Sequence, residues 1–182
     1  MTDTDREKRM RDLVALVADP VHRYLHRRAD AATADDVLGD TLLVCWRRLD
    51  EVPADALPWA IVVARQCLSN ARRAERRRTR LIGRIIAIDP PPAAVHDNTA
   101  ASTVDTVAVT TALTHLRRND AEILRLWAWD ELTSPQLAVV LGISANAAAI
   151  RLHRAKARFK QELLKSDGPT GHVSHDEGIT DA

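Results

Sequence analysis

Basic side chains are concentrated in two parts of a chain that is otherwise close to neutral. The 182 residues carry a formal net charge of +1 at pH 7. Residues 72–84, however, hold seven arginines and one glutamate, and residues 151–165 hold six basic residues and one acidic residue. Guanidinium and ammonium groups at this density neutralise the phosphates of a polyanion. The two clusters therefore predict that this chain binds a nucleic acid.

The second cluster lies in a segment, residues 133–163, whose pattern is typical of a helix-turn-helix. Thr133 and Gln136 have the spacing of a capping box at the start of a helix. Gly142 then suits a sharp turn, and Ser144 is a favourable N-cap for a second helix. That second helix has small and apolar residues along one face and basic residues along the other. A helix that is thin at its start and positive beyond it fits the major groove of DNA.

The outward positions of this second helix are the candidate DNA contacts. Its tip is apolar, so it can touch thymine methyl groups but cannot make bidentate contacts with guanine. The basic residues that follow are expected to bind phosphates. We therefore expect weak direct recognition of bases and a larger contribution from DNA shape. The candidates are Ser144, Asn146, Ala149, Ile150, Arg151, His153, Arg154 and Lys156.

The elements that carry these residues are expected to be helices. Hydrophobic residues make up 46% of the chain, yet only four Trp, one Tyr and one Phe are aromatic. The core must then be built largely from Ala, Leu, Val and Ile, and this composition favours helices over strands. The fold class is predicted to be all-α, with two small helical domains and a flexible proline-containing linker between them. The C-terminal domain contains the helix-turn-helix.

The predicted domain bounds follow the helical spacing of apolar residues. They are 9–78 for the first domain, 79–108 for the linker, 109–165 for the second domain and 166–182 for a disordered tail. In the first domain one helix is expected to begin near Ala32–Thr33, with Thr33 and Asp36 as its cap, and another at Pro58. Trp127 and Trp129 are expected to fill the core of the second domain.

Several function classes are not supported. The chain has no Gly-rich phosphate loop, no metal-ligand spacing and no nucleophile constellation, so neither an enzyme activity nor a cofactor nor a metal site is predicted. Cys45 and Cys67 lie in apolar helical patterns and are expected to be small buried residues. His172 and His175 in the tail are expected to be solvated. No stretch resembles a membrane span or a signal peptide. We therefore expect that the protein does not insert into a membrane and that it is cytoplasmic.

Three motifs, at 34–49, 57–78 and 116–159, make this chain resemble the extracytoplasmic-function (ECF) group of bacterial RNA polymerase sigma factors. The resemblance covers about residues 10–165. The family's A-E-D-L-V-Q-E-x-F-L-x-x-W-R helix is similar to ADDVLGDTLLVCWRRL at 34–49. Its P-W-L-x-x-x-A-R-N helix with a basic end is similar to LPWAIVVARQCLSNARRAERRR at 57–78. Its four-helix C-terminal unit, with the signature L-H-R-A-[KR]-x-R, is similar to residues 116–159. Each motif alone is a weak signal, but three in this order and at this separation are a strong one.

The resemblance implies a protein that binds core RNA polymerase and promoter DNA. The first domain would then bind core polymerase and the −10 promoter element, and the second domain would recognise the −35 element through the residues given above. Family members are commonly held inactive by an anti-sigma protein, which is a third candidate partner. The implied core-binding residues are Asp36, Asp40 and Arg47, with Val37 and Leu43 as apolar contacts around the carboxylates. The implied −10 contacts are Gln66 and Asn70, whose amides can pair with base edges, and Arg72, Arg73, Arg76 and Arg77.

Two alternatives are open, and one of them is suggested by departures from the family pattern. Gly39 stands where the family usually has Gln, and Ala149 where a basic residue is common. An interaction protein that has lost its DNA specificity would show such changes. The other alternative is a helix-turn-helix transcriptional regulator that does not bind core polymerase. It would need a sensory domain, and residues 9–78 show no alternating strand and helix pattern for one.

Overall fold

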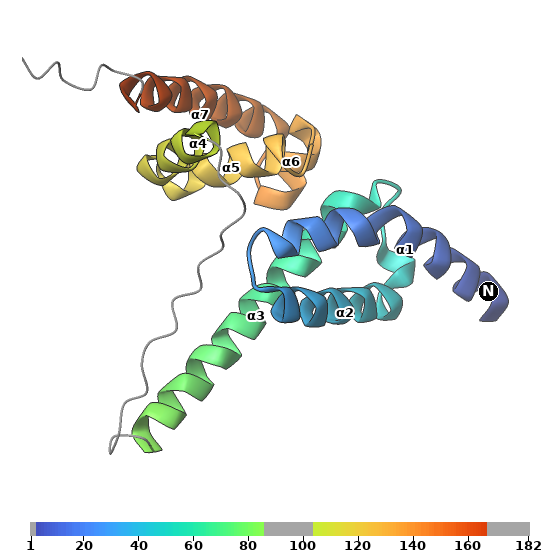
Figure 1. Cartoon of the computed structure of the whole chain (residues 1–182). Coiled ribbons are helices and arrows are strands. Elements are labelled where there is room, and N and C mark those ends of the chain that lie inside the picture. The colour runs from blue at the N-terminus through green and yellow to red at the C-terminus, as the bar shows by residue number, and fades with distance from the viewer. Residues whose placement is uncertain (1–2, 86–103, 167–182) are drawn as a thin grey trace, which may run out of the picture.

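The computed structural model describes residues 3–85 and 104–166, and in these ranges all regular structure is helical (Figure 1). The prediction of an all-α fold is confirmed. The prolines of the predicted linker lie in 86–103 and the predicted tail lies almost entirely in 167–182, and both segments fall outside the described residues.

The first group of helices consists of α1 (Asp3–His26), α2 (Ala31–Arg47) and α3 (Ala56–Ile85), with a short 3-10 turn at Leu49–Glu51. Their apolar faces meet in one core, as expected when the stripe of each amphipathic helix is buried against its neighbours. α1 contributes Val17, Val21 and Leu25, while α2 contributes Val37 and Cys45 and α3 contributes Ala60, Ile61 and Ala64.

Two helix starts differ from the prediction. The N-cap of α2 is Asp30, whose carboxylate accepts hydrogen bonds from the Thr33 backbone N–H at 2.9 Å and the Thr33 hydroxyl at 2.8 Å. The expected cap of Thr33 with Asp36 is therefore wrong, because Asp30 already satisfies the free backbone donor. α3 begins at Ala56 rather than Pro58, and continues to Ile85, since arginine is a good helix former and nothing in its basic run breaks the helix.

The second group consists of α4 (Val104–His115), α5 (Arg118–Ala128), α6 (Ser134–Leu141) and α7 (Ala145–Ser166). Its core includes Ile123 and Leu126 from α5, Leu137 from α6, and Leu152 and Ala155 from α7. α4 starts at Val104, five positions before the predicted start of this domain at 109. Arg158 on α7 donates to the buried Asp120 carboxylate at 2.5 Å, which attaches the long last helix to α5.

The helix-turn-helix has the local geometry that its sequence predicts. The Thr133 backbone N–H donates to Gln136 Oε1 at 3.0 Å, so the capping box is present. Gly142 adopts the left-handed conformation at φ 64°, which a residue with a Cβ rarely adopts. Ser144 Oγ then accepts from the Ala147 N–H at 3.2 Å and caps α7. α6 and α7 meet at 102°.

The expectation that Trp127 and Trp129 fill the core is wrong. They are 41% and 42% exposed at the C-terminal end of α5, beyond its buried face. Each ring is covered by a cation instead of by apolar side chains. Lys156 Nζ lies 3.4 Å from the centroid of the Trp127 ring, and the Arg125 guanidinium lies 5.9 Å from that of Trp129. Both contacts are cation–π interactions.

The two groups of helices contact each other mainly between α3 and α6, and their buried apolar residues belong to one continuous cluster. Polar side chains add hydrogen bonds there and at the corner after α1. Arg65 on α3 donates to the Val140 carbonyl at 3.0 Å, and Gln136 donates to the Asp55 carboxylate at 3.1 Å. The Asp130 carboxylate, only 2% exposed, accepts from Arg27 and, at 3.3 Å, from Arg28. Burial raises the pKa of Asp130, while Arg28 and Arg27 act in the opposite direction.

None of the helices in the ranges 3–85 and 104–166 is by itself long and apolar enough to cross a membrane, although α6 and α7 together pass that test across their bend.

Candidate nucleic-acid interface

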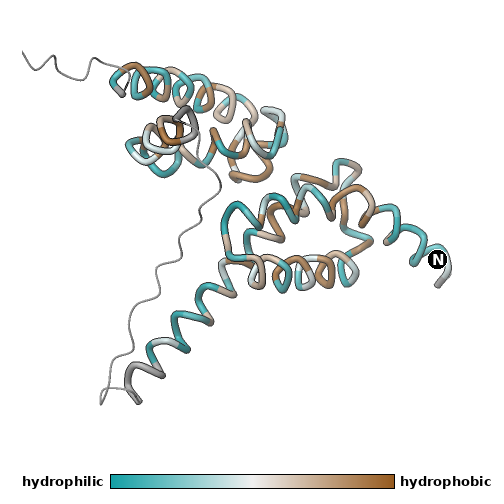
Figure 2. The backbone as a smooth tube through the Cα atoms, in the orientation of Figure 1, coloured by the Kyte–Doolittle hydropathy of each residue, from teal (hydrophilic) through white to brown (hydrophobic). Residues whose placement is uncertain are grey.

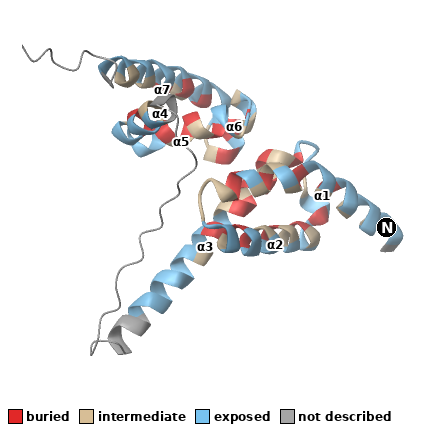
Figure 3. Ribbon diagram, in the orientation of Figure 1, coloured by how far each residue is buried: buried red, intermediate tan, exposed pale blue. Residues whose placement is uncertain are grey.

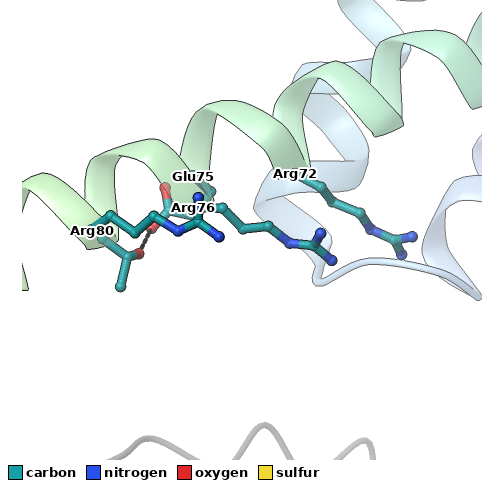
Figure 4. A pocket seen from close by; sticks show the side chains of 5 residues that line it. Arg72, Glu75, Arg76 and Arg80 are labelled. Atoms are coloured by element: carbon teal, nitrogen blue, oxygen red, sulfur yellow. Dashed lines mark hydrogen bonds between the residues drawn. The ribbon is translucent and has the colours of Figure 1, made fainter.

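The C-terminal half of α3 projects beyond the helical core and carries the first basic cluster (Figures 1 and 3). From Arg72 to Arg80 every side chain is exposed, and the segment is strongly hydrophilic (Figure 2). Arg72, Arg76 and Arg80 follow one another at intervals of four residues and line an open pocket along one side of the helix (Figure 4). The only acid of this run, Glu75, accepts a hydrogen bond from the Thr79 hydroxyl at 3.4 Å.

The predicted −10 contacts all lie on this helix, but some of them already form hydrogen bonds within the protein. Gln66 and Asn70 are exposed and lie one turn apart. Arg73 donates to Asn70 Oδ1 at 3.0 Å, which leaves the Asn70 amide N–H groups for another acceptor. Arg72 donates to the carbonyl of Arg28, two residues after the end of α1.

Arg76 and Arg77 are the arginines of this set that are best placed to bind a phosphate. Among the residues that the structure describes, no carboxylate forms an ion pair with either of them, and both are exposed. Their charges are therefore available to phosphates at little cost in lost internal contacts.

α7 presents its outer face to solvent even though the two groups of helices are in contact. Asn146, Ala149 and Ile150 form the exposed tip, with Ile150 44% exposed. His153 and Arg154 are exposed in the next turn, whereas Arg151 is half-buried. Two predicted contacts are engaged within the protein, because Ser144 caps α7 and Lys156 covers Trp127.

The predicted core-polymerase contacts lie on α2, and four of the five form a narrow exposed stripe. Asp36, Asp40, Leu43 and Arg47 recur at four-, three- and four-residue steps and are all exposed, Leu43 by 45%. Val37 is the exception, since it lies about 100° further around the helix and is only 1% exposed. Its assignment as a surface contact is therefore wrong: Val37 packs in the core of α1, α2 and α3.

Two features of this molecule were not found by sequence reasoning. One is the buried Asp130 that joins the two groups of helices, for which the sequence offers no signal because its arginine partners are about 100 residues away. The other is a cluster of His22, His26 and Asp35 at the junction of α1 and α2. The signal for this cluster was present, since two histidines four residues apart share one face of a helix. No metal site is nevertheless predicted there from the sequence.

Comparison with known proteins relates this chain to RNA polymerase sigma factors. Residues 106–159 match the family model for region 4 of sigma-70. A probable RNA polymerase sigma factor, RfaY of Xanthomonas campestris, is 31% identical over 144 residues, covering 75% of this chain and 35% of that protein. This chain thus spans about a third of the length of that relative. The ECF RNA polymerase sigma factor SigL of Mycobacterium tuberculosis is 29% identical over 158 residues, covering 85% of this chain and 88% of SigL.

Solved structures show the same fold. The sigma factor RpoE of Bartonella quintana, crystallised with the anti-sigma factor NepR, has a TM-score of 0.54 and is 21% identical, covering 86% of this chain and 97% of that one. CnrH, solved with the cytosolic domain of CnrY, has a TM-score of 0.52 at 21% identity, covering 87% and 88%.

Proposed function

Because this chain belongs to the ECF group of the sigma-70 family, we propose that it binds core RNA polymerase and directs transcription from promoters with a −10 and a −35 element. The observation that carries this proposal is the presence of three separate exposed surfaces on α2, α3 and α7, one for each expected partner. The exposed stripe on α2 supports binding to core polymerase, which a regulator that only bound DNA would not do.

In this proposal the α2 stripe binds core polymerase. Two carboxylates four residues apart, Asp36 and Asp40, form an acidic patch, and Leu43 beside them adds apolar area that is still exposed. A contact with an apolar centre and charges around it has the composition of a specific protein interface. The N-cap of α2 is Asp30, so the Asp36 carboxylate is not needed to cap the helix.

The basic half of α3 binds the −10 element in this proposal. Arg76 and Arg77 would contact the phosphates, and the amides of Gln66 and Asn70 would contact a base edge. Because phosphate contacts release bound cations, removing two of them should lower the slope of log affinity against log salt concentration by about 2.

α7 binds the −35 element in the major groove. Its tip of Asn146, Ala149 and Ile150 offers one amide and two apolar side chains to the bases, and His153 and Arg154 flank it for the backbone. This tip supports our proposal that sequence-dependent DNA shape contributes much of the preference of α7 for its −35 sequence. No catalytic role is proposed for any residue.

We also propose an anti-sigma protein as a partner and a cytoplasmic location. The support is by analogy: the sigma factors RpoE and CnrH, which share the fold, were solved with an anti-sigma factor and with the cytosolic domain of CnrY.

The test is run-off transcription with purified core polymerase. The wild-type protein should give promoter-specific transcripts and a stable complex with core. The variant Asp36→Ala/Asp40→Ala should lose the complex while it keeps its affinity for promoter DNA. The matched control Asp12→Ala/Asp19→Ala removes two exposed carboxylates from α1 and should behave as the wild type. Specific DNA binding without any complex with core would overturn the proposal in favour of a regulator that acts without core polymerase.

A further inference from the structure

Three metal-ligating atoms converge where α1 ends and α2 begins. His22 Nε2 lies 3.0 Å from Asp35 Oδ1 and 2.9 Å from His26 Nε2, and His26 Nε2 lies 3.6 Å from Asp35 Oδ1. The three atoms form a small triangle, although they come from two helices. None of these side chains belongs to the surfaces assigned above to polymerase or promoter DNA.

The backbone that carries this triangle is held in place by the fold. His22 and His26 are one turn apart on α1, next to the buried residues Val21 and Leu25. Asp35 lies in the first turns of α2, beside the buried Ala34, and the Asp30 cap fixes where that helix begins. The ligand set would therefore need little rearrangement on binding an ion, and pre-organisation of this kind lowers the cost of binding.

Hydrogen bonds among these three side chains cannot satisfy all three atoms at once. A neutral imidazole has one N–H and one lone pair, and a carboxylate has only lone pairs. If the His22 Nε2–H points at Asp35, the His26 Nε2 lone pair has no hydrogen to accept. If His26 Nε2–H points at His22, the Asp35 oxygen faces a nitrogen that has no hydrogen. Two N–H groups facing each other would repel. A cation at the centre accepts all three lone pairs at once.

The dimensions fit a small transition-metal ion. Zn–N bonds of about 2.0–2.1 Å place tetrahedral ligand atoms about 3.3 Å apart. The three observed separations, 2.9, 3.0 and 3.6 Å, lie on both sides of that value. Two imidazole nitrogens and one carboxylate oxygen are a donor set that suits Zn²⁺ and its neighbours in the first transition row, whereas Mg²⁺ and Ca²⁺ prefer oxygen ligands alone.

The charges of the nearby arginines are directed away from the triangle. Arg27 and Arg28 pair with Asp130, and the Arg28 guanidinium lies 3.8 Å from the centroid of the Tyr24 ring. Arg23, Arg27 and Asp130 line the cavity on the side of α1 that faces the second group of helices. The local repulsion of a divalent cation is thereby reduced.

We propose that His22, His26 and Asp35 form a binding site for Zn²⁺. The ion would connect the end of α1 to the start of α2, immediately before Asp36. The three side chains are 42%, 37% and 65% exposed, so the fourth coordination position faces solvent and takes a water molecule or a side chain of a bound protein. Zinc binding at this site does not depend on the proposed function in transcription.

The test is a zinc titration by calorimetry of the full chain, without an affinity tag and after removal of metal with a chelator. The wild type should bind one Zn²⁺ at this site, and Mg²⁺ at the same concentrations should not bind. His22→Ala/His26→Ala and Asp35→Asn should each weaken the binding of this ion by about 100-fold or more. These variants remove direct ligands of the ion, and loss of a residue that only orients a ligand already costs about 10–100-fold in affinity. A Co²⁺-loaded wild type should show the visible absorption of a four-coordinate site, and the variants should lose it.

The matched control is His172→Ala/His175→Ala, which removes two histidines from the C-terminal segment and should leave both signals unchanged. Circular dichroism of the metal-free proteins separates loss of the ligands from loss of the fold, and Asp35→Asn keeps the size and the exposure of the original side chain. The proposal is overturned if the wild type binds no Zn²⁺ at micromolar concentrations. It is equally overturned if the control loses the ion while His22→Ala/His26→Ala retains it.

Discussion

The contact between the two groups of helices should depend strongly on one buried group, the Asp130 carboxylate. Its side chain is 2% exposed, and those of its partners Arg28 and Arg27 are 12% and 27% exposed. Asp130→Ala would leave two guanidinium groups without their shared acceptor in a largely dry contact. Breaking a buried ion pair from one side costs about 3–5 kcal/mol.

The structure favours the lower end of this range. Both arginines keep some access to water, and Arg28 retains Glu122 at 3.7 Å. The Nε atom of Arg27 is buried and makes no hydrogen bond within the described residues even in the intact protein, so part of the desolvation cost is already present. We therefore expect a loss of about 3 kcal/mol, which shifts the equilibrium between contacting and separated units by roughly 150-fold.

Small-angle X-ray scattering and amide hydrogen exchange would measure this shift. Asp130→Ala should increase the radius of gyration and lower the protection of the α6 amides, while helicity stays the same. Asp50→Ala is the matched control, because Asp50 also accepts from two arginines of α1, Arg6 and Arg9, but is 60% exposed. An exposed pair contributes at most about 1 kcal/mol. Unchanged scattering and exchange in Asp130→Ala, or equal effects in the two variants, would refute this reasoning.

Three further predictions test single positions. Gly39→Ala should raise the free energy of unfolding by about 0.5–1 kcal/mol, because Gly39 is exposed within α2 and an added Cβ would meet no atom within 4 Å; an unchanged or lower urea midpoint would contradict this. Tyr24 is the only tyrosine, and burial raises its pKa to about 12, with Arg28 acting in the opposite direction. The folded state thus favours the protonated phenol, so its contribution to stability is complete below pH about 10 and is lost as the pH rises towards 12. Phenolate absorbance should show this in the folded protein, and a midpoint near 10 would be inconsistent with it. Ala149→Arg should add a guanidinium that can pair with guanine and should change the preferred −35 sequence in a binding selection; an unchanged preference would show that α7 does not meet the bases through this position.

A sequence pattern can reveal interactions between residues that are close together in the chain. The parts of this structure that depend on such local interactions were predicted well. The helix-turn-helix is the clearest example, since the capping box at Thr133, the left-handed Gly142 and the Ser144 cap all involve residues within four positions of one another. The stripe of Asp36, Asp40, Leu43 and Arg47 likewise follows from the period of one helix. The cap of α2 was misplaced because Asp30 and Thr33 both suit that position, and propensity alone does not separate them.

Burial was predicted less well, because it depends on which elements come to lie against a residue. Val37 has the same hydrophobicity at the surface as in the core, and only the packing of α2 against α1 and α3 decides that it is buried. Trp127 and Trp129 are exposed since α5 directs other side chains into the core and leaves these rings to Lys156 and Arg125.

The sequence by itself determined that this protein is all-helical, that it carries two basic surfaces and that its last two helices before the tail form a helix-turn-helix. Each of these follows from residue type and from spacings of a few positions. Only the tertiary structure decided that Asp130 meets Arg27 and Arg28, and that His22, His26 and Asp35 converge on one point. These contacts join side chains of different helices, and the distances between such side chains are set by the packing of the helices, which no periodicity along the chain records.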